Sequence, residues 1–210
     1  MNHPFVAIVN YNVGNLKAIS DVCELLDFNA VITDDHEIIK AADKIILPGV
    51  GSFDWALDRL NSSGLREIVE DCVIKHSVPI LGICVGMQLF MEESEEGKLS
   101  GLGWIEGSCM HFEKLIKNTK LPIPHMGWNS VEASLKTDLF DNVKSSEFYF
   151  LHSYFVKPTL SENILGTTYF GDFFCSAVSK DNIFGVQFHP EKSHTGGVSL
   201  IKNFLEAQIC

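Results

Sequence analysis

The segment Val78-Pro-Ile-Leu-Gly-Ile-Cys84-Val-Gly86 decides how this chain folds and where its chemistry is to be sought. Residues 78–83 form a continuous apolar run, which is typical of a strand buried on both faces of a parallel sheet. Residues 85–91 continue with the pattern of a helix. A buried strand that passes directly into a helix is the repeating unit of parallel sheets, so this segment predicts an α/β fold.

The same alternation of strand and helix extends back to the N-terminus. Short apolar runs predict strands at 5–10, 30–33 and 44–47, and helical spacing predicts helices at about 15–26, 37–42, 52–60 and 65–76. We therefore expect a mostly parallel central sheet flanked by helices.

The second half of the chain has a different character. Shorter strand-like pieces occur at 104–112, 129–132, 148–156, 173–179 and 183–188, and Gly196-Gly197 precedes a last predicted helix at 198–207. Consecutive strands without intervening helices predict hairpins, and therefore an antiparallel extension of the sheet. No linker rich in Pro, Gly or Ser divides the chain, so we expect a single domain over residues 1–210.

Composition and charge exclude several classes of protein. Against 16 Lys and Arg stand 27 Asp and Glu, and the resulting formal net charge of -11 disfavours nucleic acid as a main partner. The longest apolar runs are far shorter than the roughly 20 residues of a membrane-spanning helix, and the N-terminus lacks the pattern of a secretion signal. We expect a cytoplasmic protein without a membrane span.

Six cysteines are scattered along the chain without a CxxC pair. This pattern disfavours a disulfide framework or a zinc site, and we expect neither a metal nor another cofactor. The cysteines expected to be small core residues are Cys23, Cys72, Cys109, Cys175 and Cys210. The acidic run from Glu92 to Glu96 is expected to be a solvated helix end and loop.

Cys84 differs from the other cysteines because it lies between Gly82 and Gly86 at the predicted strand-to-helix junction. Glycines on both sides permit the sharp turn of a nucleophile elbow, which projects its central side chain from the carboxyl edge of the sheet. Open α/β folds bind ligands at that edge, and a helix N-terminus favours a thiolate. We expect Cys84 to be a nucleophile, against the alternative of a structural cysteine.

A thiol nucleophile needs a base, and His189 is the best candidate among eight histidines. It ends a strand-like segment, and Glu191 shares its face in an extended chain, so the carboxylate can orient the imidazole and stabilise its charged form. His152 also ends a strand-like run but lacks a nearby carboxylate, and we expect it to be a hydrogen-bonded structural residue.

The loop Pro48-Gly-Val-Gly51 directly follows a predicted strand. Attack of a thiolate on a carbonyl creates an oxyanion, and a glycine-flanked turn can aim backbone N–H groups at it. We expect one donor from Val50 or Gly51 and another from Val85, which follows the nucleophile. For this loop alone, an ordinary turn at the end of a strand is the alternative.

With these elements the chain resembles the class I, triad-type glutamine amidotransferases. Within them it looks like the HisH family, the glutaminase subunits of imidazole glycerol phosphate synthase. The matching segments are Tyr11-Asn-Val-Gly-Asn15, Leu47-Pro-Gly-Val-Gly-Ser-Phe53, Leu81-Gly-Ile-Cys-Val-Gly-Met-Gln-Leu89, Pro124-His-Met-Gly-Trp-Asn129, Phe150-Leu-His-Ser-Tyr154 and Gly185-Val-Gln-Phe-His-Pro-Glu-Lys-Ser193. Two residues depart from the family pattern: Val85, where leucine is common, and Asn12 in the first loop.

The resemblance implies a flavodoxin-like fold and hydrolysis of L-glutamine to glutamate and ammonia. It implies a γ-glutamyl thioester on Cys84, with His189 as acid and base and Glu191 as its orienting group. It further implies that glutamine is held by Gly51, Gln88, Ser153 and Tyr154. Helical geometry agrees for Gln88, which lies one turn after the nucleophile, although a solvent-facing residue is the alternative there.

Ammonia released to water becomes mostly ammonium, so a glutaminase needs an acceptor site that receives its product. The resemblance implies a HisF-like (β/α)8-barrel cyclase as the heterodimer partner, with imidazole glycerol phosphate and AICAR made for histidine biosynthesis. The family's interface positions match Asn15, Met126, Trp128, Asn129 and Lys192. Local sequence alone favours core positions for Met126 and Trp128. The resemblance also implies that activity is low without the loaded partner and rises through the backbone at Val50-Gly51.

Three alternatives stay open at this point. A HisH-like paralogue would feed ammonia to a synthase that amidates nucleotide sugars for surface polysaccharides. A cysteine peptidase or a glyoxalase-like protein would share the α/β topology, although the Pro48–Gly51 loop together with Gln88 favours a small amide substrate. A scaffold without activity is disfavoured because Cys84, His189 and Glu191 are all present.

Overall fold

Parallel strands form the part of the sheet that carries the predicted chemistry. The computed structural model describes residues 3–116, 121–133, 138–143 and 145–207. The parallel strands lie in the order β2 (Ala30–Thr33), β1 (Val6–Val9), β3 (Lys44–Gly49), β4 (Ile80–Cys84) and β13 (Ile183–Val186). Every residue of β1, β3 and β4 is buried, because helices cover both faces. The predicted α/β sheet is confirmed.

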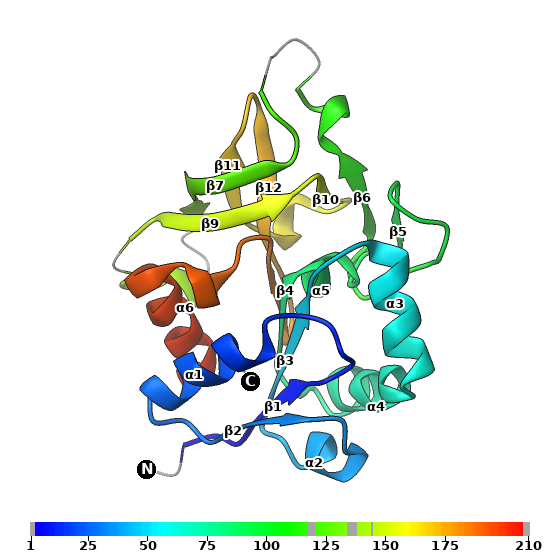
Figure 1. Ribbon diagram of the computed structural model, residues 1–210, viewed down its shortest axis with the longest axis vertical. Coiled ribbons are helices and arrows are strands. Elements are labelled where there is room, and N and C mark those ends of the chain that lie inside the picture. The colour runs from blue at the N-terminus through cyan, green and yellow to red at the C-terminus, as the bar shows by residue number, and fades with distance from the viewer. Residues whose placement is uncertain (1–2, 117–120, 134–137, 144, 208–210) are drawn as a thin grey trace.

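Helices lie on both sides of these strands (Figure 1). One side carries α1 (Leu16–Leu25) and α6 (His194–Glu206), and the other carries α3 (Phe53–Ser62) and α4 (Leu65–Glu70), with α2 (His36–Lys40) against α4. In α3 the buried residues are Phe53, Ala56, Leu57 and Leu60, whose spacing of three and four forms one apolar stripe. This stripe faces the sheet, while the rest of the helix meets solvent.

The sheet continues beyond β13 with antiparallel strands, as predicted. These are β12 (Phe173–Lys180), β10 (Tyr154–Pro158) and β6 (Gly107–His111), followed by the short β5 (Glu93–Ser94), which is parallel to β6. A strand that the sequence pattern missed, β11 (Ile164–Tyr169), pairs with β12 and with β8 (Glu132–Ala133).

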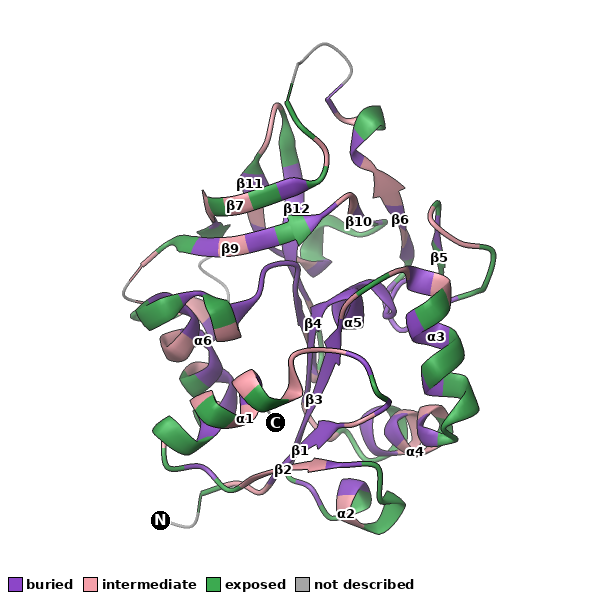
Figure 2. Cartoon of the chain, in the orientation of Figure 1, coloured by how far each residue is buried: buried purple, intermediate pink, exposed green. Residues whose placement is uncertain are grey.

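β7 (His125–Ser130) and β9 (Glu147–His152) form a separate two-stranded antiparallel ribbon. Burial alternates along β9: Phe148, Phe150 and His152 are buried, whereas Leu151 is exposed (Figure 2). One face of the ribbon therefore packs on the molecule and the other faces solvent.

The single strand expected at 148–156 is wrong, because β9 pairs with β7 whereas β10 pairs with β6 in the main sheet. The last helix begins at His194 rather than at 198, and Gly196-Gly197 lies inside it. A Cβ on Gly197 would stand 1.9 Å from the carbonyl oxygen of Pro190. The glycine thus permits close packing inside the helix and does not mark its start.

Two further helices are shorter than predicted. The helix expected at 65–76 is α4 followed by a π-helical turn at Asp71–Lys75, and the one expected at 85–91 is α5 (Val85–Gln88). The solvated loop expected at 92–96 is wrong in part, since Ser94 is buried in β5. The carboxylate of Glu96 accepts a hydrogen bond from the backbone N–H of Phe53 at 2.7 Å, which ties this segment to the start of α3.

The cysteines behave as expected wherever the structure describes them: Cys23, Cys72, Cys109 and Cys175 are buried free thiols. Cys210 lies outside the described residues. Among the helices of the described ranges, none has the length and apolar character needed to cross a membrane.

Candidate active site

Cys84 is the last residue of β4 and directly precedes α5, in a backbone conformation of φ 55° and ψ -113°. A positive φ is strained for a residue with a Cβ, and it persists only where the surrounding packing enforces it. Here a Cβ on Gly86 would stand 2.0 Å from the carbonyl oxygen of Leu47, and one on Gly82 would stand 2.6 Å from the ring of Phe90. Gly86 therefore lets α5 approach β3 closely, and Gly82 leaves room for the ring of Phe90 against β4.

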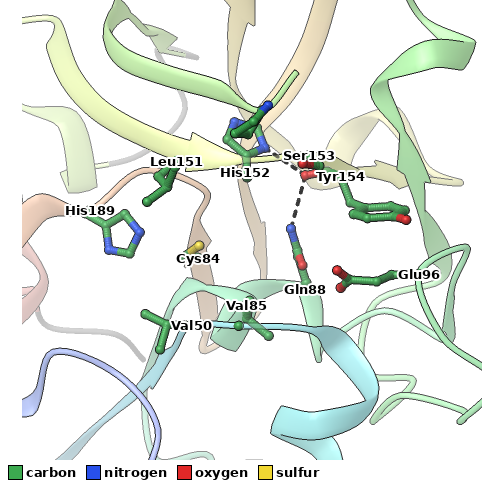
Figure 3. A pocket seen from close by; sticks show the side chains of 12 residues that line it. Val50, Cys84, Val85, Gln88, Glu96, Leu151, His152, Ser153, Tyr154 and His189 are labelled. Atoms are coloured by element: carbon green, nitrogen blue, oxygen red, sulfur yellow. Dashed lines mark hydrogen bonds between the residues drawn. The ribbon is translucent and has the colours of Figure 1, made fainter. Parts of the chain in front are cut away.

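The sulfur of Cys84 faces a cavity of about 290 Å³ at the carboxyl ends of the parallel strands (Figure 3). The cavity is lined by Val50, Gly51, Cys84, Val85, Gln88, Glu96, Pro124, Leu151, His152, Ser153, Tyr154 and His189. Its walls come from β3 and β4 on one side and from β9 and β10 on the other. The main sheet and the β7–β9 ribbon thus meet at this site.

His189 lies just beyond β13 and lines the same cavity. Its Nδ1 hydrogen-bonds to Oε1 of Glu191 at 2.9 Å, and the amide of Asn15 donates to the same oxygen at 2.8 Å. Burial by itself lowers the pKa of His189, but hydrogen bonds with Cys84 and Glu191 outweigh it and raise the pKa to about 10.

Glu191 shows the reverse balance. Burial raises its pKa, and the hydrogen bond with His189, the charge on that imidazole and the amide of Asn15 more than offset this and lower it overall. The pair is therefore arranged to hold an imidazolium beside a carboxylate.

A pair of buried glutamines connects the nucleophile to the opposite wall of the cavity. The amide of Gln187 donates to the sulfur of Cys84 at 3.6 Å, and its Oε1 accepts from Gln88 at 3.0 Å. Gln88 also donates to the main-chain carbonyl of Tyr154 at 3.1 Å. The solvent-facing alternative for Gln88 is wrong, because α5 turns this residue under the cavity.

The loop after β3 lies against the elbow. Gly49 pairs with Cys84 in parallel register, so Val50 and Gly51 leave the sheet beside the sulfur. Gly51 has a φ of 83°, which glycine adopts without strain. The buried hydroxyl of Tyr11 donates to the carbonyl oxygen of Pro48, and burial raises its pKa, so it stays a neutral donor.

This geometry agrees with a family match. The model of the family described as glutamine amidotransferase class-I matches residues 10–207. The chain belongs to the class-I glutamine amidotransferases. The peptidase and glyoxalase-like alternatives are not supported by this match.

Curated relatives place the amidotransferase more narrowly. It is 48% identical over 202 residues to the imidazole glycerol phosphate synthase subunit HisH 2 of Methanococcus maripaludis, covering 96% of this chain and 98% of the relative. It is 44% identical over 200 residues to the subunit HisH of Leptospira interrogans, covering 95% and 98%. The chain belongs to the HisH branch of the family.

Solved structures match in fold. A crystal structure titled glutamine amidotransferase superposes with a TM-score of 0.74 at 18% identity, covering 96% of this chain and 97% of the other. The structure of PurLQS from Thermotoga maritima superposes with a TM-score of 0.71 at 17% identity, covering 97% and 98%. At these identities the likeness concerns the fold alone.

The structure brings the predicted catalytic, oxyanion-hole and glutamine-binding residues of the amidotransferase to one cavity. Glu191 is the exception, since it lies behind His189 rather than at the surface of the cavity. His152 is buried and hydrogen-bonded, as expected of a structural histidine.

The predicted interface residues divide into two groups. Met126 and Trp128 are 66% and 47% exposed on the outer face of the β7–β9 ribbon, so the core alternative for them is wrong. Lys192 is also exposed, with its amine 5.7 Å from the ring centre of Tyr149 on the same side. We call this outer side, with Met126, Trp128 and Leu151, the ribbon face.

Asn15 and Asn129 point inward instead. The amide of Asn15 is committed to Glu191, and that of Asn129 donates to His125 at 3.1 Å and to the carbonyl of Tyr169 at 3.0 Å. The family resemblance grouped Asn129 with Met126 and Trp128 as interface positions. Side chains alternate in β7, however, and Asn129 lies on the opposite side from Trp128.

Sequence reasoning missed Gln187 and Glu96 as residues of the site. Gln187 lies two residues before His189 in the same strand-like run, so strand periodicity could have placed it on the same side. Glu96 was hidden in an acidic run, and only the pairing of β5 with β6 turns it into the cavity.

Proposed function

We propose that Cys84, His189 and Glu191 hydrolyse the side-chain amide of L-glutamine. The thiolate of Cys84 attacks the amide carbon and forms a tetrahedral oxyanion. The imidazolium of His189 gives its proton to the nitrogen as the carbon–nitrogen bond breaks, which releases ammonia and leaves a γ-glutamyl thioester. A water molecule then attacks the thioester while His189 takes its proton, and glutamate leaves with the thiol restored.

The observation that carries this proposal is the strained elbow of Cys84 in one cavity with a histidine that is itself bound to a buried carboxylate. Backbone N–H groups of Val50 or Gly51 and of Val85 are the proposed donors to the oxyanion. They come from the loop and the helix end that flank the sulfur, and such donors are often the largest single contribution to rate.

The rest of the cavity fits the end of glutamine that carries the α-amino and α-carboxyl groups. Gly51, Gln88, Ser153 and Tyr154 are proposed to hold it. Glu96 adds a carboxylate to this wall, where it lies close to Gln88 and Tyr154 (Figure 3). We propose that Glu96 binds the α-ammonium group, because a buried cation requires an opposite charge.

We propose that the ribbon face binds the synthase subunit that receives ammonia. The relatives are named as subunits of a synthase, which supports a partner subunit for this chain. Its exposed Met126, Trp128 and Leu151 form an apolar surface beside the cavity, since Leu151 also lines the cavity. The proposed partner is a HisF-like (β/α)8-barrel cyclase in a heterodimer. Asn15, Asn129 and Lys192 remain predictions as interface residues.

Histidine biosynthesis is the pathway that the HisH relatives support for this glutaminase. They give no support to a synthase that amidates nucleotide sugars. A cytoplasmic location and a single domain over residues 1–210 stay predictions.

The test is covalent trapping together with turnover. A diazo-norleucine analogue of glutamine should label Cys84, located by peptide mass spectrometry. Cys84→Ala should abolish glutamine hydrolysis without weakening partner binding, whereas Cys23→Ala, a buried cysteine far from the cavity lining, should keep both. Label on another residue, or full turnover by Cys84→Ala, would refute the proposal.

A further inference from the structure

A chain of hydrogen bonds crosses the β7–β9 ribbon from Asn129 to the wall of the cavity. Asn129 donates to Nε2 of His125 at 3.1 Å, and Nδ1 of His125 lies 3.0 Å from Nε2 of His152. Nδ1 of His152 lies 2.7 Å from the carbonyl oxygen of Tyr154. The same carbonyl accepts from Gln88, which leads through Gln187 to the nucleophile.

The direction of every bond in this chain is determined by its ends. A carbonyl only accepts, so Nδ1 of His152 carries a proton and donates to Tyr154. Burial lowers the pKa of His125 to about 4 and that of His152 to about 3, so each ring is neutral and carries one proton. Nε2 of His152 must then accept, Nδ1 of His125 must donate, and Nε2 of His125 must accept.

Asn129, at the other end of this series of hydrogen bonds, provides the donor that Nε2 of His125 needs. The Oδ1 of Asn129 accepts from the backbone N–H of Ser130 at 2.8 Å, and its amide donates to Tyr169 as well as to His125. These partners orient the side-chain amide with its N–H groups toward the histidine. A carboxylate in this place could not donate and would demand the opposite direction.

Aromatic rings surround the histidine pair, and both histidines are buried. The rings nearest to it are those of Phe112, Phe150, Phe170 and Phe174, at centroid distances of 4.2 to 6.0 Å. In such surroundings a misdirected hydrogen bond finds no replacement and stays unmade, which makes the direction of the chain consequential.

We propose that Asn129, His125 and His152 are positioning residues that hold the Tyr154 carbonyl for Gln88 and so connect the placement of β7 to the glutamine cavity. The inference rests on the proposed function, because Gln88 is taken to hold glutamine. β7 contributes to both features: its outward residues Met126 and Trp128 belong to the ribbon face, and its inward residues Asn129 and His125 begin the series of hydrogen bonds. A partner that shifts β7 would thereby act on glutamine binding.

The decisive variant is Asn129→Asp in the full chain, because it keeps the size of the side chain while a charged carboxylate, which can only accept, replaces the donating amide. Its carboxylate should draw the proton of His125 to Nε2. His152 then cannot donate both to His125 and to Tyr154. Asn142→Asp makes the same exchange at an exposed turn residue and serves as the matched control.

Two readouts are taken on each protein. Nitrogen-15 spectra of histidine-labelled protein should show Nδ1-protonated tautomers for His125 and His152 in the wild type and in Asn142→Asp, and a changed tautomer of His125 in Asn129→Asp. The KM for glutamine should rise about three- to tenfold in Asn129→Asp with kcat nearly unchanged, as expected for the loss of one buried hydrogen bond. Unchanged tautomers, or changed tautomers with an unchanged KM, would overturn the proposal.

A second pair of variants guards against loss of folding at Asn129. His152→Asn keeps a donor near the position of Nδ1 and should retain a KM closer to that of the wild type than His152→Phe, which keeps a ring but no donor. Equal KM values for the two would count against positioning through this bond. A wild-type chain that hydrolyses no glutamine even with its loaded partner subunit would refute the proposed function alone, since the tautomers would still decide the direction of the hydrogen bonds.

Discussion

Cys84 and Glu191 both raise the pKa of His189, so the charge of Glu191 should contribute to the pH at which the enzyme loses activity on the alkaline side. The imidazolium of His189 must be present to protonate the leaving nitrogen, and its pKa is raised to about 10. Activity should therefore persist through neutral pH and fall as the pH rises through that value. Glu191→Gln removes the negative charge but keeps an oxygen that can accept from His189 and Asn15.

The structure sets the size of this effect. The side chains of His189 and Glu191 are only 4% and 1% exposed, so solvent screens their interaction weakly. An opposite charge within hydrogen-bond distance shifts a pKa by about 1 to 3. Without it, only Cys84 opposes the effect of burial, so the pKa of His189 falls. The alkaline limb of kcat/KM should move to lower pH by about that amount, with a loss of about tenfold at pH 9.

The assay is the pH dependence of glutamine hydrolysis by steady-state kinetics, measured from pH 6 to 11 on the wild type and the variant. Glu162→Gln, which removes a charge at an exposed residue, should keep the wild-type profile. An alkaline limb of Glu191→Gln at the wild-type pH would show that the carboxylate does not sustain the imidazolium, and the proposed division of roles would fail.

Three further substitutions test the residues that hold the active site in place and the proposed docking surface. Tyr11→Phe leaves the buried carbonyl of Pro48 without its donor, and should lower the free energy of unfolding by about 1 to 3 kcal/mol in urea titration and reduce kcat more than it raises KM. Gly86→Ala would place a Cβ 2.0 Å from the backbone oxygen of Leu47, so the free energy of unfolding should fall by about 1 to 3 kcal/mol or more. A urea midpoint equal to that of the wild type would contradict the close packing of the elbow. Trp128→Ala should change the free energy of unfolding by less than about 1 kcal/mol, because Trp128 is 47% exposed. It should weaken binding of the proposed cyclase subunit tenfold or more in calorimetry, and equal affinity would exclude the ribbon face as the docking surface.

Local sequence patterns predicted those features that depend on one short segment alone. The elbow at Cys84 and the pair His189 and Glu191 could be found because their chemistry depends on neighbours within two residues along the chain. The strand at 148–156 failed for the opposite reason. Its division into β9 and β10 depends on β7 and β6, two partners that no local pattern reveals.

The sequence by itself determined the alternation of buried strands and amphipathic helices, the elbow and the residue types of a thiol hydrolase, because periodicity and glycine placement are local properties. Only the tertiary structure decided that Gln187 touches the sulfur, that Asn15 steadies Glu191 and that Met126 and Trp128 face solvent. The physical reason is that hydrogen bonds and burial depend on which strand edges meet in space. Residues as distant as Asn15 and Glu191 become partners only when the sheet has brought them together.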